Sequence, residues 1–136
     1  MQTKSILSLD DLKKIAAAAE AEARAKNRAV TISIDDAGGH LLWLQRLDGA
    51  APISSHIAPA KAKTAALGRR ESKTYEDMIN NGRFSFLSAP ELEGLLEGGV
   101  PIMVDGQCVG AVGVSGVKSS EDVQIAKAGI AAVTLA

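Results

Sequence analysis

The stretch that decides the fold is Pro101-Ile-Met-Val-Asp-Gly-Gln-Cys-Val-Gly-Ala-Val-Gly-Val114. Its Asp105-Gly106 pair favours the tight two-residue turn of a β-hairpin, because both residues tolerate positive φ. The pattern therefore predicts one strand over 101–104 and a second over 107–114. A capping box, Ser119-Ser-Glu-Asp122, begins a final helix, whose inward positions are predicted to be Val123, Ala126, Ile130 and Val133.

A second hairpin is predicted in the N-terminal half of the chain. Residues Val30–Asp35 alternate apolar and polar side chains with period two, as a half-buried strand does. The turn over 36–39 contains two glycines, and a returning strand follows over His40–Leu47. Within that strand, the run Leu41–Leu44 predicts burial on both faces.

Two longer helices are predicted on either side of this hairpin. The first is capped by Ser8 and runs to about Lys26, with apolar residues spaced three and four apart. An alanine-rich second helix begins near Ser55 or Ala58, because Pro59 is tolerated only in the first turn of a helix. The alanines give it a surface that another backbone can approach closely.

Residues 74–99 form a long connection between the second helix and the last hairpin. A short helix is predicted over Thr74–Asn80 and a further helical turn near Pro90. Long connections of this kind are often functional or lie in an interface. The apolar side chains with little regular structure to bury them, which predict an oligomer contact, are Phe84, Phe86, Leu87, Leu92, Leu95 and Leu96.

These elements predict a single α+β domain over residues 1–136, with one antiparallel sheet flanked by helices. A chain of 136 residues with 46% hydrophobic and 23% charged residues is an ordinary globular domain rather than a disordered segment. No apolar run approaches the length of a membrane span. The N-terminal residues lack the apolar core of a signal peptide, which favours the cytoplasm.

Charge and aromatic content exclude further classes of function. The net charge is −1, whereas non-specific nucleic-acid binding needs a strong positive excess. With one Trp, one Tyr and two Phe, the chain also has few rings on which bases could stack. The one cysteine, Cys108, excludes an intramolecular disulfide and a cysteine-based metal site.

Three groups of residues are candidates for chemistry. His40 and His56 carry the imidazoles, although no His-x-x-x-His spacing for zinc is present. Lys61 and Thr64 lie one turn apart on the second helix and are predicted to share a cleft, with the lysine available to an anion. Backbone N–H groups at the glycine-rich strand end are predicted either to form an anion site or to allow close helix packing; the residues concerned are Gly113, Ser115 and Gly116.

Five ordered blocks resemble the GlcG/HbpS family, which includes the C-terminal domain of PduO-type proteins. They span nearly the whole chain and are Val30–Leu41, Arg46–Ala50, Lys61–Ala65, Gly98–Ile102, and Gly110–Gly116 followed by Glu121-Asp122. The resemblance implies a profilin-like α+β fold. It also implies an even-numbered homo-oligomer, a dimer at minimum and an octamer at the larger end, and haem binding near subunit boundaries in some members.

A bound haem would need an axial ligand and cations for its propionates. His40 falls inside a matched block and is expected to be the iron ligand ahead of His56, because imidazole is the strongest donor present. Met103 and Cys108 are weaker candidates, since their strand pattern predicts burial. The candidate cationic partners are Lys61 and Arg69.

Two functions from different classes remain open at this point. The first is a non-catalytic protein that binds haem or a related tetrapyrrole at an oligomer interface. The alternative is an enzyme or accessory protein of glycolate-type or diol-type metabolism that binds a small carboxylate at Gly113–Gly116. A structural oligomer without a ligand is a third alternative.

Overall fold

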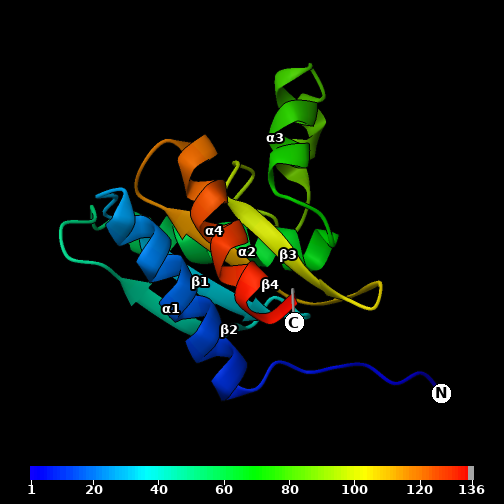
Figure 1. Ribbon diagram of the computed structural model, residues 1–136. Helices are drawn as coiled ribbons and strands as arrows, with labels where there is room; N and C mark the ends of the chain where they lie inside the picture. The colour runs from blue at the N-terminus through cyan, green and yellow to red at the C-terminus, as the bar shows by residue number, and fades with distance from the viewer. Residues whose placement is uncertain (135–136) are drawn as a thin grey trace.

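The computed structural model describes residues 1–134 and places a sheet between helices on its two faces (Figure 1). The elements are α1 Leu9–Ala25, β1 Thr31–Asp36, β2 Leu41–Arg46, α2 Ser54–Gly68, α3 Lys73–Asn80, the 3-10 helix η1 Phe84–Ser88, β3 Gly99–Val104, β4 Gln107–Ser115 and α4 Ser119–Thr134. The predicted α+β class, with an antiparallel sheet flanked by helices, is confirmed. The predicted domain also includes residues 135–136, which lie outside the described residues.

The two hairpins join into one sheet through β1 and β4. The strand order is β2-β1-β4-β3, and each neighbouring pair is antiparallel. Side chains alternate along β1, so Ile32 and Ile34 point to the opposite face from Ser33 and Asp35. Helices α1 and α4 pack on the isoleucine face, where they form the apolar core, and α2 packs on the other face.

The helix starts show one correct and one wrong capping prediction. Ser8 caps α1 in a complete capping box with Asp11, as the sequence predicts. At α4, the carboxylate of Asp122 instead accepts a hydrogen bond from the backbone N–H of Val117 at 3.2 Å and pairs with Lys61. The predicted box at Ser119 is therefore wrong, because a tertiary partner takes the carboxylate.

Strand β2 is confirmed, but the predicted burial of Leu41–Leu44 on both faces is wrong. Strand β2 lies at an edge of the sheet, where the helices cover it less than they cover β1 and β4. Its side chains are therefore exposed at Leu41, Leu42 and Leu44. A run of leucines indicates a strand but does not reveal whether that strand lies at the edge.

Helix α2 begins earlier than predicted. Residues 51–54 form a turn that leads directly into the helix at Ser54. Pro59 consequently lies in the helix interior instead of the first turn, at the cost of one helical hydrogen bond.

The connection over 74–99 is partly folded on itself. Helix α3 agrees with the prediction, whereas the second helix is η1 instead of a turn near Pro90. Helices α3 and η1 pack on each other and project from the layers as an arm (Figure 1). Phe86 stacks on Tyr75 with ring centroids 5.0 Å apart, and Leu95 is buried, while the apolar side chains left exposed are Phe84, Leu87 and Leu96.

Candidate functional site

A mainly apolar hollow lies between the N-terminal segment and the first hairpin. It has a volume of about 400 Å³, which is in the range of small-molecule sites. Apolar side chains from three separate parts of the chain line it, and His40 lies at its rim. The apolar lining residues are Ile6, Leu7, Leu42 and Val109, and Lys4 adds a cation.

The imidazole of His40 is held by an aspartate across the turn. Its Nδ1 lies 3.0 Å from Oδ1 of Asp36, which also accepts the backbone N–H groups of Gly38 and His40 at 2.8 and 3.0 Å. A Cβ at position 38 would lie 2.8 Å from the imidazole ring, so a larger residue there would displace the ring from this position. The local sequence thus orients the ring and leaves Nε2 as its outward nitrogen.

Opposing effects set the charge of Asp36. Partial burial works to raise the pKa of its carboxyl group, but hydrogen bonds from the backbone of His40 and Gly38 and from the His40 ring hold that pKa below its usual value. Asp36 is therefore ionised at neutral pH. An ionised carboxylate at Nδ1 favours the tautomer in which Nε2 carries the lone pair.

The neighbouring carboxyl group, Asp35, lies on the opposite face of β1 and is buried. Burial raises the pKa of Asp35 to about 7, and the nearby charge of Asp36 acts in the same direction. Among the described residues, Oδ1 of Asp35 and the hydroxyl of Ser33 have no hydrogen-bond partner. This carboxyl group lies under α2 and does not line the hollow beside His40.

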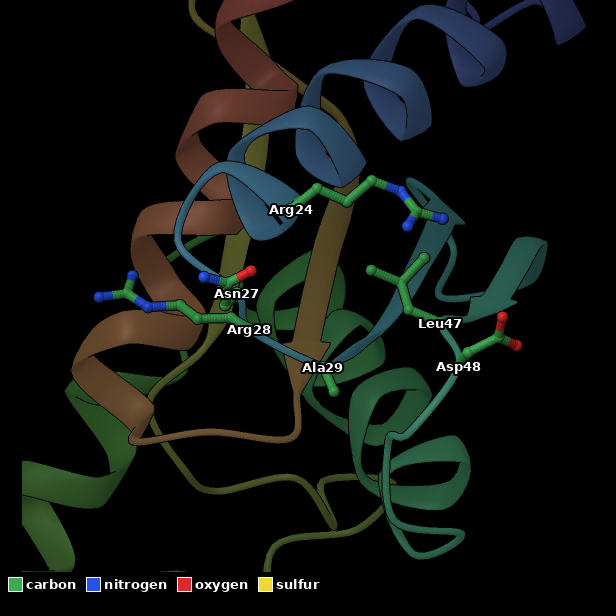
Figure 2. A pocket seen from close by; sticks show the side chains of 6 residues that line it. All are labelled: Arg24, Asn27, Arg28, Ala29, Leu47 and Asp48. Carbon is green, nitrogen blue, oxygen red and sulfur yellow. The ribbon is translucent and has the colours of Figure 1, made fainter.

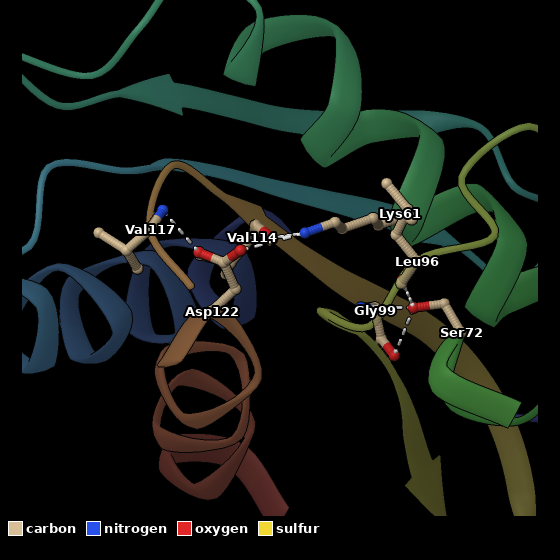
Figure 3. Close-up of polar contacts among 7 residues, drawn as sticks. All are labelled: Lys61, Ser72, Leu96, Gly99, Val114, Val117 and Asp122. Carbon is tan, nitrogen blue, oxygen red and sulfur yellow. Dashed lines mark hydrogen bonds and ion pairs between the residues drawn. The ribbon is translucent and has the colours of Figure 1, made fainter. Parts of the chain in front are cut away.

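The predicted cleft at Lys61 and Thr64 is wrong, because both side chains are buried between α2 and the sheet. The ammonium of Lys61 donates to the carbonyl of Val114 at 2.9 Å and to Oδ2 of Asp122 at 3.1 Å (Figure 3). The hydroxyl of Thr64 donates to the carbonyl of Ala60 within the helix. The lysine thus links α2, the end of β4 and the start of α4 rather than meeting a ligand.

The glycine-rich strand end packs closely against α2. A Cβ on Gly113 would lie 2.1 Å from the carbonyl oxygen of Ala58, so the helix occupies the space above this backbone. Ser115 is buried, and Gly116 has a φ of +147° where the chain passes the backbone of Ala29. Of the two predictions for this segment, this geometry favours close helix packing.

The other predicted residues lie apart from His40. His56 is exposed in the first turn of α2, and Arg69 is exposed at the end of that helix. Arg69 lines a separate hollow that shares Lys4 with the hollow beside His40. Met103 was expected to be buried but is exposed next to a β-bulge, whereas Cys108 is buried as expected.

A polar hollow at the end of α1 is a weaker candidate (Figure 2). Its two guanidinium groups already have partners, since Arg24 pairs with Glu20 and Arg28 pairs with Glu121 at 2.9 Å. Figure 2 also shows the side chain of Arg28 pointing away from Leu47 and Asp48 on the far wall. Two paired arginines facing different ways do not make a clamp for an anion.

Sequence reasoning found His40 but missed Asp36 and the apolar lining. The signal for Asp36 was present, because an aspartate four residues before a histidine across a Gly-Gly turn can reach its ring. The lining could not be found from the sequence, since Ile6, Leu42 and Val109 come together only in the folded chain.

Residues 1–134 show neither a metal cluster nor a membrane-spanning helix. Within this range, no group of three or more His, Cys, Asp or Glu side chains is placed to hold a metal ion. None of the helices described is long and apolar enough to cross a membrane.

Comparisons with known proteins agree on one family. The family described as "Haem degrading protein HbpS-like" matches residues 7–131. Protein GlcG of Escherichia coli K12 is 56% identical over 115 residues, which cover 85% of each chain. The structure of Klebsiella pneumoniae protein ORFY superposes with a TM-score of 0.89 at 29% identity, over 97% of this chain and 93% of that one. The PduOC:heme complex superposes with a TM-score of 0.86 at 31% identity, over 95% and 96%.

Proposed function

The chain belongs to the GlcG/HbpS family, and from this premise we propose that it is a non-catalytic protein that binds haem or a related tetrapyrrole in the hollow beside His40. The observation that carries the proposal is the pairing of the His40 ring with Asp36. Histidines that ligate metals usually donate their second ring N–H to a carboxylate, a backbone carbonyl or water, which fixes the ring and raises its basicity as a ligand. His40 has this arrangement, with 3.0 Å between Nδ1 and the carboxylate oxygen.

The lining of the hollow suits an amphipathic macrocycle. Apolar walls from Leu7, Leu42 and Val109 would pack on the ring, and Nε2 of His40 would face the iron from the rim. Lys4 offers a cation to a propionate, and Arg69 lies in the adjoining hollow. A haem bound here would supply an iron centre whose properties depend on its axial ligand. The neighbour named as a PduOC:heme complex supports the choice of ligand.

The alternative function, a carboxylate site at the glycine-rich strand end, has less support. Helix α2 covers Gly113, and the ammonium of Lys61 is already paired with Asp122. An anion would have to displace both. The small-molecule ligand is therefore assigned to the His40 hollow.

We further propose that the protein is an even-numbered homo-oligomer, with a dimer as the smallest form and an octamer as a larger one. Exposed apolar side chains at Phe84 and Leu87 on the arm, and at Leu42 and Leu44 on β2, support this assembly. Monomers rarely leave contiguous apolar patches open to water. Light scattering at several concentrations measures the mass directly, and a constant mass of 14.1 kDa would contradict the assembly.

The binding proposal is tested by titrating hemin into the purified protein and recording the Soret band. We expect saturation at a fixed stoichiometry for the wild type and a loss of affinity of at least about tenfold for His40→Ala. His56→Ala is the matched control, since it removes an exposed imidazole elsewhere and should change neither spectrum nor affinity. Asp36→Asn should weaken binding roughly tenfold and alter the spectrum, because the ring loses its orienting carboxylate. A His40→Ala variant with the full ligated spectrum and affinity would overturn the assignment.

A further inference from the structure

The N-terminal segment, residues 1–6, lies outside the helices and strands and passes the end of the sheet where β3 turns into β4 (Figure 1). All six residues are exposed. Within residues 1–134, one hydrogen bond ties this segment to the sheet, from the side-chain amide of Gln107 to the carbonyl of Thr3 at 3.3 Å. A single exposed hydrogen bond adds little stability, so the segment is only weakly fastened.

A small polar hollow lies between this segment, the turn from β3 to β4, and the end of α2. Its volume is about 210 Å³, which is below the range of sites for drug-sized molecules and suits a small ion. The residues that line it are Gln2, Lys4, Arg69, Met103, Gly106, Gln107 and Cys108. Two of them are cations, two carry amide groups, and none is acidic.

The two cations of this hollow lack the partners that other cations of the chain have. Within residues 1–134, neither Lys4 nor Arg69 takes part in an ion pair. At the hollow of Figure 2, by contrast, Arg24 and Arg28 are each paired with a glutamate. Two like charges that border one small hollow repel each other, and an anion between them replaces that repulsion by attraction.

The end of α2 fixes the position from which Arg69 reaches the hollow. Arg69 has a φ of +56° at the helix C-cap, and its backbone N–H donates to the carbonyl of Ala65. The next residue, Arg70, is engaged elsewhere. Its guanidinium lies over the ring of Tyr75, 5.6 Å from the centroid. Of these two neighbouring arginines, only Arg69 lines the hollow.

We infer that Lys4 and Arg69 bind a small oxyanion, a free phosphate or carboxylate, and that the bound ion fastens the N-terminal segment to the end of α2. A guanidinium offers two parallel N–H donors to such a group, and the ammonium of Lys4 adds a second charge from a separate part of the chain. The amides of Gln2 and Gln107 offer further N–H donors. The inference goes beyond the proposed function, because the ion would bind without haem and apart from His40.

Isothermal titration calorimetry of the protein without hemin tests the site. Inorganic phosphate and acetate are titrated separately at constant ionic strength, so that the two kinds of oxyanion are compared. We expect one ion per chain, with phosphate bound more tightly because its second charge meets the second cation. Arg69→Gln should weaken phosphate binding at least about tenfold. Arg70→Gln is the matched control and should leave it unchanged. Saturation by neither ion, or an equal loss in both variants, would overturn the site.

Limited proteolysis tests whether the ion fastens the segment. Trypsin cleaves after lysine, so cleavage after Lys4 releases residues 1–4, which mass spectrometry detects. Phosphate should slow this cleavage several-fold in the wild type and leave its rate unchanged in Arg69→Gln. A rate that phosphate does not change in the wild type would contradict the fastening.

A hemin titration separates this inference from the proposed function. The other source of a carboxylate near Arg69 is a propionate of haem in the adjoining hollow. If neither free ion binds and Arg69→Gln weakens only the binding of hemin, the two cations serve the propionates and the inference is wrong. If phosphate binds and the wild type fails to bind hemin, the anion site stands and the proposed function fails.

Discussion

The two faces of the sheet are held by different forces. The face toward α1 and α4 buries large apolar side chains, including Ile32, Ile34 and Ile102. The face toward α2 buries alanine, glycine and polar groups, so its helix approaches the strands closely and depends on specific partners. The free energy gained by burying apolar side chains is roughly proportional to the buried area, and such packing tolerates small changes of shape. A face built from close contacts and buried polar groups should respond more sharply to single substitutions.

The largest expected effect is the loss of the cation of Lys61. Lys61→Met leaves the buried carboxylate of Asp122 without its ammonium, at 2% side-chain exposure. Removing one partner of a buried ion pair costs about 3–5 kcal/mol. Urea unfolding at neutral pH measures the free energy of unfolding and should show a loss of this size.

Two controls show whether the loss comes from the uncompensated charge. Lys63→Met, two residues along the same helix, removes a lysine whose partner Glu91 is at the surface, and it should change stability little. The double variant Lys61→Met/Asp122→Leu removes both charges and should recover a large part of the loss. If Lys61→Met is as stable as the wild type, the α2 face is not more sensitive to single substitutions than the other face, and the prediction is wrong.

The second effect concerns the unpartnered carboxyl group of Asp35. Its pKa of about 7 in the folded state lies above the unfolded value of 3.8, so between these values the folded chain binds more protons than the unfolded chain. Stability should therefore fall as the pH rises from about 4 to 7 and then level off. The size of this loss is roughly 4 kcal/mol, from about 1.4 kcal/mol per unit of pKa difference.

Asp35→Asn isolates this contribution. The amide has nearly the same shape and does not ionise. The free energy of unfolding of the variant, minus that of the wild type, should therefore be larger at pH 8.5 than at pH 5. Chemical unfolding at the two pH values gives the difference, in which other titrating groups largely cancel. Asp48→Asn is the control, because it changes an exposed aspartate. If the free energies of unfolding of wild type and Asp35→Asn change with pH in parallel, the α2 face stabilises the ionised carboxylate of Asp35 and the prediction is wrong.

The sequence predicted the strands better than their surroundings. Alternation over Val30–Asp35 and the Asp105-Gly106 turn depend on local backbone preferences, so both hairpins were found. The position of β2 at the edge was not, because strand order is set by which hairpins join. Lys61 was misjudged for a related reason. Helical spacing does not tell which lysine is buried, and its partner Asp122 lies 61 residues away.

The candidate site was also predictable only in part. His40 was singled out by its residue type and by the block that contains it, and the structure gives its ring an orienting carboxylate. The hollow beside it depends on tertiary contacts between residues 4–7, the hairpin and Val109. The chemistry of single residues could therefore predict an iron ligand, but it could not predict the shape of the hollow that a bound molecule would occupy.

The smallest expected effect is the difference in stability between two substitutions that each change one methyl group, one on each face of the sheet. Gly113→Ala adds a methyl group where a Cβ would lie 2.1 Å from the carbonyl oxygen of Ala58 and 2.6 Å from the backbone nitrogen of Ala62. Both atoms belong to a helix backbone, so α2 must shift as a unit, at a cost of about 1–3 kcal/mol. On the other face, Ile34→Val deletes one methyl group, at a cost of about 0.5–1.5 kcal/mol. Thermal unfolding of the two variants side by side measures both, and equal or reversed losses would show that close approach does not hold the α2 face.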